Sequence, residues 1–197
     1  MDNRGLAGAF IFVGGVQFAI GIVLAEIFYP GYNVFGNYIS DLGATCRETC
    51  TTYQPSAFIF NTSAIFLGIF ILLGSYCILL EFKNYLISIL IGLSGLGALG
   101  VGLFPETTDT LHLIVSLITF LFAALSAIVA RNFIKPPFNF FSVFLGFVCL
   151  AALVLFGSGF YMGLGPGGME RMIAYPVLLW AIGFGGYLMS SDKAGNQ

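Results

Sequence analysis

The chain has 197 residues, of which 58% are hydrophobic and 8% are charged, with a formal net charge of -2. A soluble domain carries roughly 25% charged residues, so this composition cannot cover a water-facing surface, and it also excludes a disordered chain and a nucleic-acid-binding protein with a basic face. The mean hydropathy of +0.98 therefore indicates an integral membrane protein.

Six apolar runs are long enough to cross a bilayer, whose hydrocarbon core needs about 20 apolar residues per helix. Backbone amides in lipid must be satisfied within one segment, and runs of this length favour helices over barrel strands. The first run is too long for a signal-peptide core, so we expect it to remain in the mature protein. The sequence predicts an all-α polytopic bundle, a single transmembrane domain over 1–197, with spans at about 6–28, 57–80, 85–104, 111–130, 138–164 and 172–189.

Lysine and arginine residues sort between alternate connections of this predicted bundle. One side holds Arg4, Lys83, Arg131, Lys135 and Lys193, whereas the other side holds Arg47 and Arg171 together with most of the acidic residues. Because basic residues accumulate on the cytoplasmic side, this distribution places both termini in the cytoplasm. We expect a multi-pass protein of the cell (plasma) membrane, in contact with membrane lipids.

The first outer connection, 29–56, is long for a compact bundle, and long connections are usually functional or disordered. Within it Val34, Phe35, Tyr38, Ile39 and Leu42 repeat at helical spacing, and Gly43 offers a helix stop. This pattern predicts a short amphipathic helix at the outer interface. A plug that merely packs over the end of the bundle is an equally good interpretation.

The four cysteines divide into two kinds. Cys77 and Cys149 lie inside spans, where a thiol usually acts as a small buried hydrophobe. Cys46 and Cys50 lie in the outer loop, on the oxidising side of the membrane, and one helical turn would bring their Cα atoms within disulfide range. Zinc would need further ligands that the neighbouring sequence does not supply. We therefore predict a disulfide and no metal.

Ionisable and polar residues converge at the predicted outer face. Charged groups at the edge of the hydrocarbon are unfavourable unless paired or hydrated, so each is a candidate for function. The loop, the ends of the first two spans and two outer connections bring the following candidates to one level: Glu26, Asn37, Ser40, Asp41, Asn61, Glu106, His112, Glu170, Arg171 and Tyr175.

Three interpretations of this cluster remain open. In the first, Arg171 takes a phosphate or carboxylate of a ligand, and the bundle receives its apolar part. In the second, the residues form an internal ion-pair network in which Arg171 holds Glu26 and Asp41. In the third, His112 is the general base of a lipid hydrolase or transferase, with Asp41 or Glu106 as its orienting partner.

Two other arrangements are weaker. A triad of Ser40, His112 and Asp109 can be written down, but no nucleophile-elbow pattern surrounds the serine. A metal-dependent hydrolase would need more ligands than one histidine and scattered carboxylates. Paired axial haem ligands are also lacking, so we expect no cofactor.

Four segments, in this order, resemble a prokaryotic membrane family called domain of unknown function 998: YPGYNVFGNYISDLGA, PSAFIFNTS, GVGLFPETTDTLH and GGMERMIAYPVLLWAIGFGGYL. The resemblance implies a six-helix membrane protein and, through a remote similarity of that family to the Frag/DRAM/Sfk group, some form of lipid handling. The residues that match the motifs are Asn37, Ser40, Asp41, Asn61, Pro105, Glu106, His112, Glu170, Arg171 and Tyr175. The CRETC segment is not part of the pattern.

The sequence thus predicts an outward-facing polar pocket that binds a lipid headgroup or small anionic amphiphile. The alternatives are the lipid hydrolase or transferase and a non-catalytic scaffold subunit of a membrane complex; a homo-oligomer is a further option. These ideas differ in geometry. Catalysis requires His112 and a carboxylate within about 3 Å, a scaffold predicts a closed network, and binding predicts a pocket of several hundred Å³.

Overall fold

The computed structural model describes residues 2–46 and 49–190 of the chain. Six of its helices are long and apolar enough to cross a membrane, as predicted. They are α1 (Asn3–Phe28), α2 (Ser56–Phe82), α3 (Tyr85–Leu103), α4 (Thr110–Val129), α5 (Phe138–Gly157) and α6 (Gly165–Ser190). Three short 3₁₀ helices join them: η1 (Ser40–Leu42), η2 (Glu106–Thr108) and η3 (Ala130–Phe133). Arg47 and Lys193, on which the predicted sidedness partly rests, lie outside the described residues.

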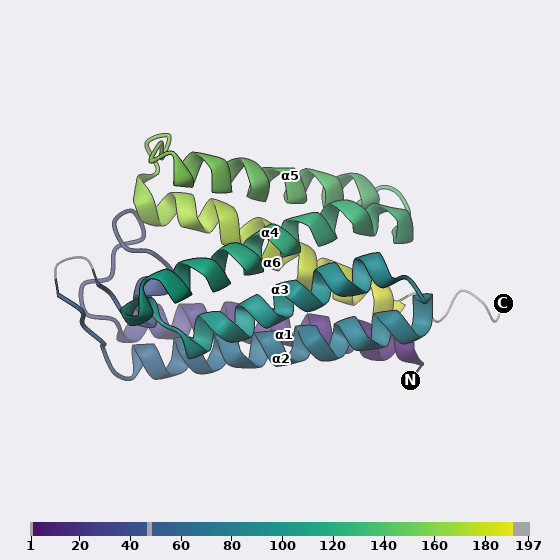
Figure 1. Ribbon diagram of the computed structural model, residues 1–197, viewed down its shortest axis with the longest axis horizontal. Helices are drawn as coiled ribbons and strands as arrows, with labels where there is room; N and C mark the ends of the chain where they lie inside the picture. The colour runs from purple at the N-terminus through teal and green to yellow at the C-terminus, as the bar shows by residue number, and fades with distance from the viewer. Residues whose placement is uncertain (1, 47–48, 191–197) are drawn as a thin grey trace.

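The six long helices form a closed ring. Each packs against its neighbours in the chain, and α6 packs against α1 as well as α5. Helix α5 is the outermost layer, lying over α4 and α6 (Figure 1). The start of α1 and the end of α6 lie at the same end of the bundle, opposite the α1–α2 loop. We call these the terminal end and the loop end.

The last two spans differ from the prediction at their shared connection. Helix α5 ends at Gly157 rather than Leu164, and α6 begins at Gly165 rather than Met172. Hydropathy alone misplaces this boundary because the residues after Phe156 are apolar but glycine-rich, with positive φ at Gly159 and Gly163. Proline is favoured in the first helical turn, and Pro166 follows Gly165 at the start of α6. Glu170 and Arg171 therefore lie on a helix and not in a loop.

The predicted amphipathic helix in the outer loop is also different in the structure. Residues 34–36 form a turn, and helical geometry is limited to the single 3₁₀ turn η1. The apolar residues do not share one face, because Ile39 and Leu42 are buried whereas Val34 and Phe35 are largely exposed. The reason lies in the polar residues between them, whose side chains bond the loop backbone locally and compete with a helix.

Small residues let the helices approach closely, as the glycine-rich third span predicts. A Cβ at Gly97 of α3 would lie 2.6 Å from the backbone nitrogen of Thr119 in α4, and one at Gly95 would lie 2.9 Å from Ile71 in α2. Towards the terminal end, a tightly packed apolar cluster that includes Ile11, Ile78 and Leu188 fills the bundle. The terminal end is therefore closed by packed side chains.

We predict that Gly97→Ala destabilises the bundle by about 1–3 kcal/mol, because the new methyl group meets backbone that cannot move aside. The matched control is Gly186→Ala in α6, where a Cβ would have no neighbour within 4 Å. Thermal unfolding in a mild detergent would compare the two. Equal midpoints for both variants would show that α3 and α4 are not held at this distance.

Candidate functional site

The first turns of α6 hold the loop between α1 and α2 by its backbone. The amides at a helix N-terminus have no partner within the helix, and that of Gly167 donates to the carbonyl of Phe35 at 3.1 Å. The amide of Ile39 donates to the carboxylate of Glu170. Gly167 has no side chain to keep the loop away, and a Cβ there would collide with the carbonyl oxygen of Asn37. The glycines of this segment are thus a docking surface for the loop.

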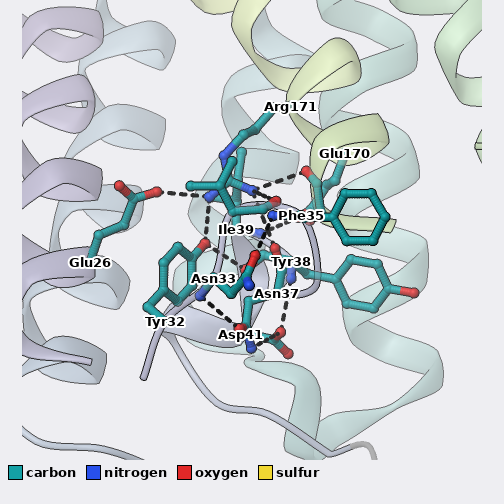
Figure 2. Close-up of polar contacts among 12 residues, drawn as sticks. Glu26, Tyr32, Asn33, Phe35, Asn37, Tyr38, Ile39, Asp41, Glu170 and Arg171 are labelled. Atoms are coloured by element: carbon teal, nitrogen blue, oxygen red, sulfur yellow. Dashed lines mark hydrogen bonds and ion pairs between the residues drawn. The ribbon is translucent and has the colours of Figure 1, made fainter. Parts of the chain in front are cut away.

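Arg171 completes this attachment. Its Nη1 donates to the carbonyls of Val34, Asn37 and Gly167 at 3.4, 3.2 and 3.0 Å. Its Nη2 donates to Glu26 Oε1 at 2.7 Å and to Tyr32 Oη at 2.6 Å. Figure 2 shows Arg171 reaching down from α6 toward Tyr32, with Glu26 approaching from the side.

The guanidinium group is saturated by the protein. The residue is 7% exposed, its Cζ lies 5.5 Å from the centroid of the Tyr32 ring, and both terminal nitrogens are fully used. Arg171 therefore ties α1, the loop and α6 together, as the network interpretation requires, and presents no spare terminal donor to a ligand anion. The ion-pair partner is Glu26.

Asp41 belongs to the same network one bond further away. Its Oδ2 accepts from Asn37 Nδ2 at 3.0 Å and from the amide of Tyr38 at 2.8 Å. Tyr32 donates its hydroxyl to the carbonyl of Tyr38 at 2.9 Å, and burial raises the pKa of Tyr32 above its usual range, so the phenol keeps this proton. Asp41 and Arg171 are thus connected through Asn37 rather than directly.

A second polar group surrounds Ser40, deeper under the loop. Ser40 Oγ donates to Glu106 Oε1 at 2.8 Å, and Ser40 also hydrogen-bonds Glu170. The other oxygen of Glu106 accepts from the amide of Cys46 at 3.3 Å. Burial raises the pKa of Glu106, and nearby Asp41 raises it further, although Ser40 and His112 oppose the shift. The three-residue group of Ser40, Glu106 and Glu170 is hereafter called the acidic mouth.

His112 lies at the start of α4 and is not oriented by a carboxylate. Its Nδ1 lies 2.7 Å from the carbonyl of Phe104, and its Nε2 lies 3.4 Å from Ser116 Oγ. A carbonyl can only accept, so the neutral ring carries its proton on Nδ1. In the described part of the chain neither Asp41 nor Glu106 bonds this ring, so the predicted orienting partner of a general base is replaced by a backbone carbonyl.

Three other candidates take supporting positions. Asn61 Nδ2 donates to the carbonyl of Gly43 at 3.3 Å and holds the end of the loop on α2. Tyr175 is 37% exposed and does not line the interior of the bundle. Asp109 is exposed beside Thr110, without a bond to His112 in the part of the chain that is described, so the Ser40, His112 and Asp109 triad is not formed.

The predicted disulfide between Cys46 and Cys50 is present, with Cα atoms 4.1 Å apart. The local structure is an antiparallel bridge between Thr45 and Thr51 rather than the helical turn that we expected. The thiols of Cys77 and Cys149 are buried and free, as predicted for positions within spans. Within the described ranges, no cluster of three or more His, Cys, Asp or Glu side chains could hold a metal ion.

A cavity of about 90 Å³ extends from the acidic mouth into the bundle. Ser40, Glu170 and His112 line its upper part, and Trp180 and Phe184 line its lower part. Its walls come from α1, α2, α3, α4 and α6, whereas α5, the outermost helix, contributes no lining residue. The cavity is smaller than the several hundred Å³ that we expected for a ligand pocket.

Several residues of this cavity were not singled out from the sequence. They include hydroxyl groups on one face of α4, at Ser116, Thr119 and Ser126, and the single tryptophan at its lower end. The spacing of the hydroxyls, which recur at helical intervals in a span that is otherwise apolar, is a signal that could have revealed the face.

A family model described as "Protein of unknown function (DUF998)" matches residues 12–187. The chain belongs to this family. The match covers α2 to α5 completely and most of α1 and α6, so the loop attachment and every lining residue of the cavity except Ile11 lie inside the family's extent. Neither a curated protein nor a solved structure matches the chain.

We predict that Arg171→Met abolishes most of the folded protein, because it leaves Glu26 and the loop carbonyls without their donor. Removing one partner of a buried ion pair typically costs about 3–5 kcal/mol. Glu26→Gln, which keeps an acceptor, should be milder. Arg131→Met at the exposed terminal end is the control, and the measurement is the yield of monodisperse protein on size-exclusion chromatography. An undiminished yield for Arg171→Met would contradict the network.

A second prediction concerns pH. Because the pKa of Glu106 is raised above its ordinary value of 4.5, the folded protein keeps this proton at pH values where the unfolded chain has released it. Stability contributed by this group therefore falls as the pH rises from about 4.5 towards neutrality. Glu106→Gln should flatten that fall in the thermal midpoint, whereas Asp109→Asn, at an exposed position on the same connection, should keep the wild-type profile. A Glu106→Gln profile parallel to wild type would refute the assignment.

Proposed function

We propose that this DUF998 protein binds an amphiphile in its central cavity, with a polar head at the acidic mouth and an apolar tail towards Trp180. The observation that carries the proposal is the polarity of the cavity. Ser40, Glu170 and His112 gather at one end, and the walls below are mainly apolar, because the hydroxyls of Thr119 and Ser126 donate back to carbonyls of α4. Ligand sites of this kind combine a largely hydrophobic lining with a few convergent polar groups.

The head that suits this mouth donates hydrogen bonds. Neither Glu106 nor Glu170 forms an ion pair with another residue of the described chain, and Arg171, the sequence neighbour of Glu170, is engaged elsewhere. An anionic head would meet the carboxyl group of Glu170 in the cavity wall and, among the described residues, no free guanidinium group. We therefore revise the expected anionic amphiphile to one with an amine or hydroxyl head, for which Ser40 and Glu170 offer acceptors.

The two alternative functions account for less of the geometry. A lipid hydrolase would use His112 as its base, but the ring is oriented by the Phe104 carbonyl and no activated nucleophile lies against it in the described residues. A scaffold subunit needs the ion-pair network of Arg171, yet it gives no role to a cavity that continues below the network. Binding uses both features, because the network fixes the loop that carries Ser40.

The test compares three probes with one tail: dodecylamine, dodecanol and dodecanoic acid, titrated into protein in lipid nanodiscs. The protein has one tryptophan, and it lines the cavity, so its fluorescence reports occupancy. We expect the amine to bind at least about tenfold more tightly than the acid, since hydrogen bonds to charged groups contribute roughly 1.5–3 kcal/mol.

The matched variants are Glu170→Gln and Asp109→Asn, which each replace one carboxyl group with an amide at the same end of the bundle. Glu170→Gln should lose most of the preference for the amine, whereas Asp109→Asn should keep it, because Asp109 does not line the cavity. If dodecanoic acid bound most tightly, the ligand would be an anionic amphiphile, as the sequence analysis predicts. No response to any of the three probes would refute the proposed function.

A further inference from the structure

The lower end of the cavity is closed by two stacked rings. Trp180 and Phe184 are one helical turn apart on α6, with ring centroids 5.2 Å apart and ring planes inclined by 12°. They are 4% and 1% exposed, and both line the cavity. Beyond them lie Ile78 and Leu188, which belong to the same buried cluster and do not line the cavity. The pair therefore forms the floor of the cavity.

This floor is held in place by hydrogen bonds. The indole Nε1 of Trp180 donates to Ser142 Oγ at 2.8 Å, and Ser142 Oγ donates to the carbonyl of Ala127 at 2.5 Å. The indole is thus attached through α5 to the last turn of α4. A buried ring whose polar atom is fixed in this way cannot rotate aside without leaving a donor unpaired in an apolar interior, which is unfavourable.

The distance from mouth to floor is set by one helix. Glu170 and Trp180 are ten residues apart on α6, which corresponds to about 15 Å along the axis. The cavity is also narrow. Its volume of about 90 Å³ is less than ten times the roughly 10–15 Å³ that one water molecule needs. Such a space accepts one extended hydrocarbon chain of medium length and excludes a lipid with two chains.

We propose that Trp180 and Phe184 act as a tail-length gauge, which makes the protein selective for single-chain amphiphiles whose tails end at the indole ring. The gauge rests on the proposed function, since it concerns the tail of the same bound amphiphile. The rings are specificity determinants: they stop the tail at a fixed depth, while the acidic mouth fixes the head.

The experiment uses terminally brominated primary alcohols, from octyl to hexadecyl, with the full-length protein in lipid nanodiscs. Bromine quenches tryptophan fluorescence at short range, so quenching of Trp180 reports a tail that has reached the floor. Lipid tails are as apolar as the cavity wall, and added methylene groups gain little by transfer from the bilayer. The dependence on length therefore measures steric fit.

We expect quenching to be weak with the octyl probe and strongest near the decyl and dodecyl probes. Tetradecyl and hexadecyl probes should bind at least about tenfold more weakly than dodecyl, because a longer tail would have to displace packed rings. Unlabelled hexadecanol should be an equally poor competitor. Equal affinity across the whole series would overturn the gauge.

Variants at the floor of the cavity test which side chain sets the preferred tail length. Phe184→Ala should move the loss of affinity to longer chains, and Phe184→Leu should give a smaller shift if the alanine variant folds poorly. Leu179→Ala is the matched control, because Leu179 precedes Trp180 but is 61% exposed and does not line the cavity. A Phe184→Leu protein with the wild-type length dependence would contradict the gauge.

The two proposals fail in different ways. If brominated and unlabelled alcohols compete for one site with no dependence on length, the amphiphile site stands and the gauge is wrong. If no probe of any length binds or quenches, the proposed function itself is wrong. Quenching that rises to a maximum and then falls supports both.

Discussion

The contacts of the Arg171 guanidinium group are those on which the structure of the loop end depends. This group is buried between α1, the outer loop and α6, and its ion pair with Glu26 spans two helices that are sequentially first and last among the spans. Desolvating a cation in this position is unfavourable unless acceptors surround it, and here backbone carbonyls provide most of them. The conformation of the loop is therefore explained by Arg171. Carbonyl groups of the loop converge on this side chain because a buried charge needs hydrogen-bond acceptors.

This constraint also explains why the polar residues of one end serve two purposes. Arg171, Glu26 and Tyr32 satisfy one another and set the height of the loop over the bundle. Ser40 is carried by that loop and comes to lie between Glu106 and Glu170, above an interior that is otherwise apolar. The ion-pair network and the cavity are thus successive layers at the loop end of the bundle.

The sequence correctly predicts the six helices and the family, and it predicts part of the candidate site. Hydropathy predicts six spans because lipid imposes one length and one hydrogen-bonding pattern on them, and the motifs place the chain among DUF998 proteins. It could not place the start of α6, since GPGGMER is typical of a polar turn, and the loop carbonyl that caps this helix comes from a distant part of the chain. The sequence also could not distinguish the roles of Arg171 and Glu170, which are neighbours in the chain. All terminal donors of Arg171 bond other parts of the protein, whereas Glu170 lines the cavity. That difference arises from the direction of two side chains on one helical turn.

The attachment of the loop has a consequence for the order of assembly. Residues 33–42 leave the ribosome after the first span, but the amide, carboxylate and guanidinium groups that receive them belong to the last span. Until α6 is inserted, residues 33–39 lack these partners and Glu26 lacks the guanidinium group of Arg171, whereas the end of the loop is already held on α2 by Asn61. Completion of the bundle and formation of the mouth are therefore a single late event in biogenesis, and a chain arrested before Gly165 would carry five spans and no site.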